Sequence, residues 1–399
     1  MKKTRILLVA AAAMLTVAAT AQPGQAPRPK TYEYKFTTVK ENPITSVKNQ
    51  NRSGTCWCFS TLSFLESEAI RIKNITDPAK YPDFSEMYVV SKSYQDRADK
   101  YVRVDGNLGF SAGSEADDVL HVASDYGLVP QQAMPGLQAL PVHGELDATT
   151  KSYVEAIAKN PNRTLSANWK KGFVAIVDTY LGECPETFTV DGVTYTPASY
   201  RDAMGINPSN YVTLTSFTHH PFYTEFAIEV SDNWRWDTAW NVPIDEFMAV
   251  IDNAIEKGYT LAWGTDCSER GFDRNGVGVL LPALTSTSGS DQERWVGRKP
   301  GDADEAEPKA PVEIVPDQAY RQEGFDNKTT TDDHGMHIFG IAKDQNGTKF
   351  YMVKNSWGET GKYKGIWYCS ENFVKGKSMD VMVHKDALPK DLRKKLGIK

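Results

Sequence analysis

The pattern of apolar residues changes near Gly258, and this change constrains the fold more than any other sequence feature. Before Gly258, apolar residues recur at helical spacing, whereas the segments after it are short and rich in β-branched and aromatic residues, as strands are. The sequence therefore predicts an α+β fold with a mainly helical part followed by a mainly β part. Helices are expected at 60–72, 85–104, 114–126, 150–182 and 244–257, and strands at 259–263, 336–342, 349–355 and 365–369.

The first 21 residues have the composition of a targeting signal. Basic residues precede an apolar run, and Ala19-Thr20-Ala21 supplies a cleavage site with small residues. The run is shorter than the about 20 residues that a membrane span needs, so we expect a cleaved signal peptide rather than a membrane anchor. The mature protein is then exported to the periplasm or the extracellular space, without stable membrane insertion. The expected organisation is a signal peptide at 1–21, an N-terminal arm at 22–45, a mainly helical lobe at 46–258 and a mainly β lobe with a C-terminal tail at 259–399.

Charge and cysteine content narrow the function. The chain holds 45 Lys and Arg against 51 Asp and Glu, a net charge of −6, and has no Lys/Arg-rich run. Nucleic acid is therefore excluded as the main partner, because phosphate binding needs clustered cations. Five cysteines are an odd number, so at least one thiol is free or pairs between chains.

Four polar residues occupy positions that suit a thiol nucleophile. Gln50 lies six residues before Cys56, and Cys56 stands where a Gly-containing loop enters a helix. A helix start and a nearby imidazolium both stabilise a thiolate, and His334 directly precedes a predicted strand. Asn355, at the end of the next strand, can hold the imidazole in one tautomer. The Gln50 amide and the Cys56 backbone N–H can stabilise an oxyanion.

These residues stand in motifs that resemble the three signature blocks of papain-like cysteine peptidases. Within that group the chain is most similar to the bleomycin hydrolase/aminopeptidase C family, and the similarity runs from about residue 44 to 370. The motifs are Gln50…Cys56-Trp57, Asp333-His334, Lys354-Asn355-Ser356-Trp357-Gly358, Phe84-Ser85-Glu86-Met87, residues 125–130, and 244–248 leading into 263–266.

The resemblance implies a papain-like two-lobe fold and a role for each residue. Cys56 corresponds to the nucleophile, His334 to the general base and acid, Asn355 to the residue that orients His334, and Gln50 to the oxyanion donor. Trp357 would shield the hydrogen bond between His334 and Asn355 from water.

The resemblance also suggests residues that contact the substrate. Ala112 and Gly113 correspond to a Gly-rich edge that binds extended peptide backbone by strand addition. Asp266 and Trp357 are placed with them as substrate-binding residues. No metal and no cofactor is expected, because an activated thiolate supplies the nucleophile.

The implied function is that of an exported cysteine peptidase that trims N-terminal residues from peptide substrates. Assembly of the protein into a homo-oligomer is left open. Endopeptidase or dipeptidyl peptidase activity is the alternative within the same chemistry. An inactive papain-like binding protein is the alternative without catalysis. A thiol–disulfide oxidoreductase using Cys56 and Cys58 is the alternative from another class, although residues i and i+2 of a helix face different sides. A zinc site of Cys56, His334 and His337 is a further alternative.

The resemblance also assigns a role to the tail. In the bleomycin hydrolase family the C-terminal carboxylate lies in the cleft and faces the substrate amine. We therefore expect residues 387–399 at one end of the cleft. This tail holds five cations and one acidic side chain, which would weaken attraction of an amine.

Overall fold

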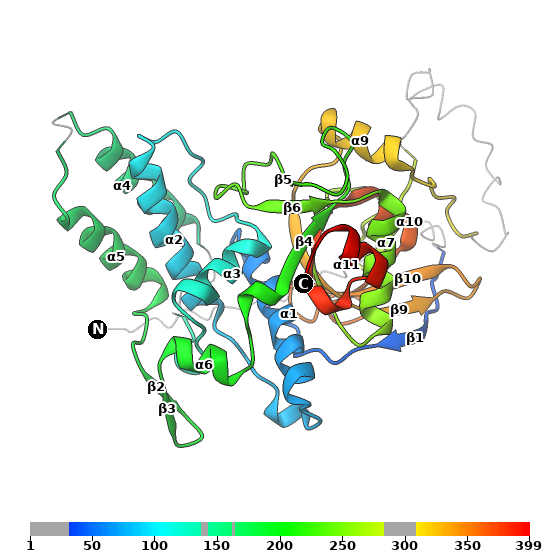
Figure 1. Ribbon diagram of the computed structural model, residues 1–399, viewed down its shortest axis with the longest axis horizontal. Helices are drawn as coiled ribbons and strands as arrows, with labels where there is room; N and C mark the ends of the chain where they lie inside the picture. The colour runs from blue at the N-terminus through cyan, green and yellow to red at the C-terminus, as the bar shows by residue number, and fades with distance from the viewer. Residues whose placement is uncertain (1–31, 137–142, 162–163, 283–308) are drawn as a thin grey trace, which may run out of the picture. The chain divides into compact units, whose positions relative to one another are not determined.

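The structure is a computed structural model that describes residues 32–136, 143–161, 164–282 and 309–399 (Figure 1). Contacts within the chain divide it into two units, and every element discussed below belongs to the unit formed by Tyr34–Leu284 and Val312–Lys399. The predicted signal peptide at 1–21 and the start of the predicted arm lie outside the described residues.

A ten-stranded sheet forms the β part of the described residues. Its strands follow the order β5-β6-β4-β12-β7-β9-β10-β11-β8, and β1 joins by pairing with β9. The strands are β1 (Thr37–Glu41), β4 (Tyr211–Thr215), β5 (Glu225–Ala227), β6 (Thr238–Asn241), β7 (Leu261–Thr265), β8 (Val277–Gly278), β9 (His334–Lys343), β10 (Lys349–Lys354), β11 (Ile366–Ser370) and β12 (Ser378–His384), with β2 (Phe188–Val190) and β3 (Val193–Tyr195) in a separate hairpin.

Strand β9 is shared by neighbours from distant parts of the chain. Along one edge it pairs with β10, antiparallel, from His337 to Lys343. Along the other edge, β7 pairs with residues 334–338 and β1 pairs with residues 340–343. The first residue of β9, His334, is therefore fixed beside β7 in the middle of the sheet.

Helix α1 (Cys56–Lys73) lies between the sheet and the other helices of the first half (Figure 1). Most of its side chains are buried, because it packs against β9 and β7 on one side and against α2 and α3 on the other. Its buried position fixes its first residue, Cys56, near the start of β9. The remaining helices are α2 (Glu86–Arg103), α3 (Ala116–Asp125), α4 (Gly144–Ala158), α5 (Asn168–Leu181), α6 (Pro197–Ala203), α7 (Ile244–Glu256), α9 (Gln318–Asp326), α10 (Glu371–Lys377) and α11 (Lys390–Lys395).

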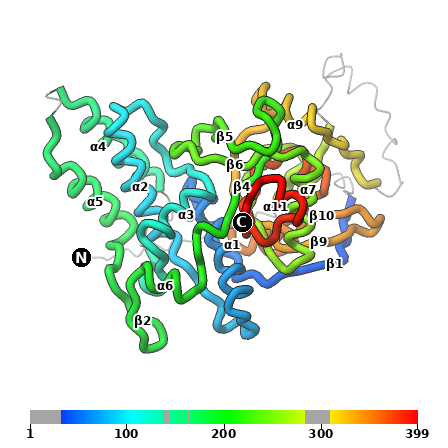
Figure 2. The backbone as a smooth tube through the Cα atoms, in the orientation of Figure 1, coloured from blue at the N-terminus to red at the C-terminus, as the bar shows by residue number. Residues whose placement is uncertain are grey.

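The C-terminal helix α11 lies beside α7 (Figures 1 and 2). Leu388, Leu392 and Leu396 are buried in the same apolar cluster as the inward face of α7. Lys395 also pairs with Glu246 of α7, with Nζ 2.5 Å from the carboxylate. The C-terminal tail is thus anchored to α7.

The predicted α+β class is confirmed, with several differences in detail. The predicted helix at 150–182 is two helices, α4 and α5. Strands β4 to β6 precede Gly258 yet belong to the main sheet, so the helical and β parts do not separate cleanly in sequence. The prediction also missed β12, whose seven residues are all buried.

Candidate active site

Cys56 is the first residue of α1. The backbone carbonyl of Thr55 accepts the N–H of Cys58 at 3.0 Å and so closes the first turn. The N–H groups of that turn have no partner inside the helix, and the positive end of the helix dipole faces the sulfur. Backbone N–H groups of Trp57 and Gly335 also hydrogen-bond the thiol and lower its pKa. Local backbone geometry therefore favours a thiolate.

His334 is held by Asn355 and covered by Trp357. Its Nε2 donates to the Asn355 side-chain oxygen at 2.7 Å, and the Trp357 ring stacks on the imidazole with centroids 4.8 Å apart and planes at 27°. Both His334 and Asn355 are buried. Because Nε2 is the donor, the neutral ring presents Nδ1 as an acceptor.

Burial acts on both titrating groups. It raises the pKa of the Cys56 thiol to about 11, and the charges of Asp332 and Asp232 raise it further. It lowers the pKa of His334, against the hydrogen bond that His334 donates to Asn355, which raises it. Burial thus disfavours the charged form of each group by itself. The thiolate–imidazolium pair, in which opposite charges would compensate each other, stays a prediction.

Cys58 and His337 point into the core. Cys58 is fully buried and its thiol donates to the Glu86 carbonyl at 3.5 Å. His337 is also fully buried and shares a 2.8 Å hydrogen bond with Ser63. Neither lines the cavity that contains Cys56 and His334. The geometry thus gives no support to a redox pair of Cys56 and Cys58, or to a zinc site with His337.

Gln50 is turned toward neighbouring chain segments. Its amide nitrogen donates to the Ser53 carbonyl at 2.7 Å, and its oxygen accepts from the Ser356 hydroxyl at 2.5 Å. Gln50 is not among the residues that line the cavity of Cys56. These two bonds fix the orientation of the Gln50 side chain, and its role as oxyanion donor stays a prediction. Its second amide N–H is the group left for a ligand.

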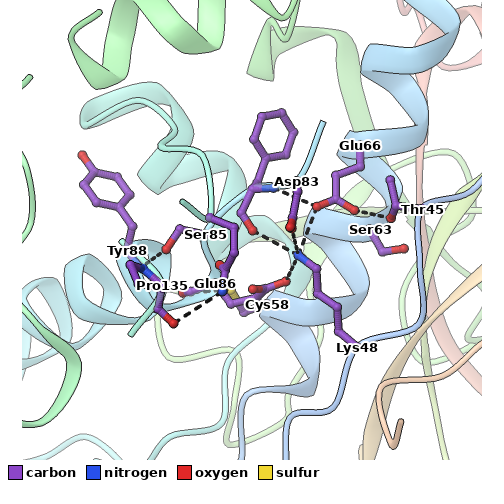
Figure 3. A network of polar contacts seen from close by, with 12 residues as sticks. Thr45, Lys48, Cys58, Ser63, Glu66, Asp83, Ser85, Glu86, Tyr88 and Pro135 are labelled. Carbon is purple, nitrogen blue, oxygen red and sulfur yellow. Dashed lines mark hydrogen bonds and ion pairs between the residues drawn. The ribbon is translucent and has the colours of Figure 1, made fainter. Parts of the chain in front are cut away.

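The segment that carries Gln50 is anchored by Lys48 (Figure 3). The Lys48 ammonium lies 3.2 Å from the Glu66 carboxylate, 2.5 Å from Asp83 and 2.6 Å from Glu86. Glu66 and Glu86 are buried, and burial raises the pKa of Glu86 to about 6 while the Lys48 charge lowers it. This cluster, called the Lys48 cluster below, ties the loop before Cys56 to α1 and α2.

Ala112 and Gly113 line the cavity, at the wall formed by residues 111–116. The Trp57 indole N–H donates to the Ala112 carbonyl at 2.9 Å, and the Gly113 carbonyl accepts from Arg97. A Cβ at Gly113 would lie 2.0 Å from the Asp232 carboxylate, so only glycine fits. Both carbonyls are already bonded within the protein, which leaves the N–H groups of this wall for a peptide.

Asp266 does not line the cavity, contrary to its assignment as a substrate-binding residue. Its carboxylate accepts from the backbone N–H groups of Ser268 at 3.0 Å and Thr331 at 3.2 Å, and Lys377 lies 3.6 Å away. These bonds point the Asp266 carboxylate toward the loops that contain Ser268 and Thr331. The bond to Thr331 connects Asp266 to the segment that leads into His334.

The tail prediction is also corrected. No residue of 387–399 lines the cavity, because burial of Leu388, Leu392 and Leu396 fixes the tail on α7.

Cys56 and His334 share one cavity of about 350 Å³, a volume in the usual range for ligand sites. The sequence prediction did not anticipate its charge. Among the described residues that line it there is no Lys or Arg, whereas six residues carry carboxyl groups. They are Glu115, Asp147, Asp232, Asp332, Asp333 and Asp380.

Burial affects several of these carboxyl groups strongly. It raises the pKa of Asp332 to about 7 and that of Asp380 to about 6. It raises the pKa of Glu115 well above the usual range, and the charges of Asp332 and Asp380 add to the effect. The cavity next to the nucleophile is thus acidic and only partly ionised at neutral pH.

Outside the cavity, one group of residues at the surface has the composition of a metal site. Among the described residues the only such group consists of His219, His220 and Glu229. Each imidazole hydrogen-bonds one Glu229 oxygen, at 3.1 and 2.9 Å, and none of the three lines the cavity.

In the described part of the chain, no helix is long and apolar enough to span a bilayer.

Comparison with known proteins gives a consistent family. The profile of the Peptidase C1-like family matches residues 2–280 and 304–398. Aminopeptidase G of Lactobacillus delbrueckii subsp. lactis is 24% identical over 392 residues, which cover 90% of this chain and 85% of that protein. Aminopeptidase E of Lactobacillus helveticus is 24% identical over 395 residues, covering 88% and 83%.

A solved structure of PepW from Lactobacillus rhamnosis HN001 has the same fold. It superposes with a TM-score of 0.67 at 18% identity, covering 90% of this chain and 84% of that one.

Proposed function

Because this chain belongs to the peptidase C1-like family, whose profile matches it nearly from end to end, we propose that it hydrolyses peptide bonds through Cys56, His334 and Asn355. Membership makes it a cysteine-type peptidase. The observation that supports the assignment of residues is the shared cavity: Cys56 at a helix start and His334, fixed by Asn355 at 2.7 Å, line the same space.

The proposed reaction begins with proton transfer from the Cys56 sulfur to Nδ1 of His334. The thiolate attacks the carbonyl carbon of the substrate, and the backbone N–H of Cys56 with the second amide N–H of Gln50 stabilises the oxyanion. His334 then donates its proton to the leaving amine, and water hydrolyses the acyl-enzyme with His334 as base. Asn355 keeps Nε2 engaged throughout, so that Nδ1 is the nitrogen that exchanges the proton.

We further propose that the substrates are peptides with a free N-terminus. The relatives that match most of the chain bear aminopeptidase names, and this likeness supports the proposal. The basic residues before an apolar run at 1–21 support export of the enzyme.

Replacement of the two neighbouring cysteines tests the assignment. Cys56→Ala should abolish peptide hydrolysis and labelling by an epoxide-type thiol inhibitor. Cys58→Ser is the matched control two residues away and should keep both, because Cys58 is buried in the core. Labelling that maps to Cys58, or hydrolysis that survives in Cys56→Ala, would refute the proposal.

A further inference from the structure

Three carboxyl groups of the cavity form no direct salt bridge with any described residue, although the charge of the buried Arg321 acts on one of them, Asp380. Glu115 caps the start of α3, Asp332 lies just before β9, and Asp380 belongs to β12. We call these three the acidic subsite. They come from three separate segments and converge on the cavity that contains Cys56.

The environment of the acidic subsite is itself acidic. Glu115 and Asp332 are hydrogen-bonded to each other, which requires a proton on one of them. The Oε1 atom of Glu115 is buried in the cavity wall and has no hydrogen-bond partner among the described residues. An acceptor buried in this way costs free energy unless a donor reaches it.

One buried cation acts on this group from outside the cavity. The charge of Arg321 acts on Asp380. Its guanidinium donates to the backbone carbonyls of Ser216 at 2.7 Å and Met379 at 3.1 Å, and it does not line the cavity. Asp380 itself accepts a hydrogen bond from the Gly264 backbone. The subsite thus offers acceptors to the cavity, and within the cavity no described cation faces them.

Two of the other three acidic residues of the cavity are hydrogen-bonded to partners, and the third, Asp232, is acted on by the charge of Arg97. Asp147 accepts from the Tyr94 hydroxyl. Asp333 accepts from the Ser268 N–H at 3.1 Å and from the Thr331 hydroxyl at 2.8 Å. The acidic subsite is therefore a distinct group within the cavity.

We infer that Glu115, Asp332 and Asp380 bind the α-ammonium group of the peptide substrate and so position its first residues against Cys56. A primary ammonium carries three N–H donors and a full positive charge, which matches three convergent carboxyl groups. Asp332 lies close enough to Cys56 for its charge to act on the thiol, so only a short stretch of peptide fits between the ammonium and the bond that is cut. This inference rests on the proposed function.

Isosteric variants with matched peptides test the inference. Glu115→Gln and Asp332→Asn remove an ionisable carboxyl group, and with it the negative charge that the hydrogen-bonded pair can carry, without changing shape. Three peptides of equal length are compared. The first has a free N-terminus and neutral side chains, the second is the same peptide with an acetylated N-terminus, and the third is the acetylated peptide with one residue replaced by Lys. Each variant should lower kcat/KM for the free-amine peptide about tenfold, because charge-assisted hydrogen bonds are lost, and should change kcat/KM for the acetylated peptides less than about twofold.

The control is Asp245→Asn, which removes a carboxylate whose side chain is 87% exposed and should change none of the three rates. Equal losses on all three peptides would overturn the inference and make the subsite structural. A selective loss on the Lys-containing acetylated peptide would also overturn it, because the bound cation would then be a side chain.

A binding measurement separates this inference from the proposed function. Calorimetry on the Cys56→Ala protein should show the free-amine peptide binding about tenfold more tightly than its acetylated form. Glu115→Gln in that background should abolish the difference. Equal binding of both peptides would refute the subsite even if Cys56 proves to be the nucleophile, and a persistent difference would support it even if Cys56 does not.

Discussion

The Lys48 cluster and the acidic subsite both hold several carboxyl groups, but only the first is joined to a cation by direct salt bridges. In the Lys48 cluster a single ammonium lies within 3.2 Å of three carboxylates. There the pKa of Glu86 rises only to about 6, whereas burial and neighbouring acids raise that of Glu115 well above the usual range.

The difference shows what the two regions are for. A buried carboxylate is tolerated when a cation and hydrogen bonds satisfy it. In the Lys48 cluster the chain supplies that cation, so the acids serve the fold by joining the loop before Cys56 to two helices. In the acidic subsite no described residue forms a direct salt bridge with the acids, which is the arrangement that the proposed binding of an ammonium group needs.

The largest effect should follow from removing the cation of the first region. Lys48→Met leaves Glu66 and Glu86 buried without their counterion and should cost about 3–5 kcal/mol in the free energy of unfolding, measured by urea denaturation. Lys375→Met is the control, since its partner Asp245 is exposed, and it should cost less than about 1 kcal/mol. Similar losses in the two variants would remove the contrast between the regions.

The second effect concerns stability and pH in the acidic subsite. The pKa of Asp332 in the folded protein, about 7, lies above its ordinary value of 3.8. For an acid with a raised pKa, the associated stability is complete below the ordinary value and is lost as pH rises through the folded value. Wild type should therefore lose stability between about pH 4 and pH 7, and Asp332→Asn should escape part of that loss.

The expected gain for Asp332→Asn over wild type is about 1–3 kcal/mol at pH 8, and it should vanish near pH 4. Thermal unfolding at a series of pH values measures it. A variant that is less stable than wild type at pH 8 would show that Asp332 is satisfied within the fold, as the acids of the Lys48 cluster are.

The smallest effect is on substrate choice. The ratio of kcat/KM for a free-amine peptide over its acetylated form should fall several-fold from pH 8 to pH 5, because Asp332 and Asp380 gain protons. Protonation of the amine alone predicts the opposite trend, since an α-amino group has a pKa of about 8. Other charged groups also act on these carboxyl groups or lie beside them. Asp232 and Asp333 act on Asp332, Arg321 acts on Asp380, and His334 lines the same cavity.

Local sequence signals anticipated the elements that carry Cys56 and His334. The Gly-containing loop followed by helical spacing predicted a helix that opens at Cys56, and α1 begins there. The β-branched and aromatic runs predicted β9 and β10, which bring His334 and Asn355 within hydrogen-bonding distance. The catalytic roles of these residues stay predictions.

The acidic subsite had no comparable signal. Its three members lie on different segments, and no spacing along a chain reports that Glu115 and Asp380 face one cavity. Strand β12 was missed although Met379, Val381 and Val383 alternate as strand residues do. That alternation would have placed Asp380 on the opposite face from these apolar side chains.

The tail shows how tertiary contacts override an expectation from family resemblance. Leu388, Leu392 and Leu396 recur at helical spacing and bury one face of the tail against α7. This arrangement cannot be deduced without knowing which surfaces meet.

The divided pairing of β9 also has a consequence for the order of events during protein synthesis. One stretch of its edge pairs with β7 and the next with β1, which was made near the beginning of the chain. Ribosomes add about 5–20 residues per second, so α1 with Cys56 emerges well before the strand that begins with His334. A nascent chain therefore carries the proposed nucleophile without its proposed base, and on that proposal the ribosome-bound protein should be unable to cut peptides until its last strands have been made.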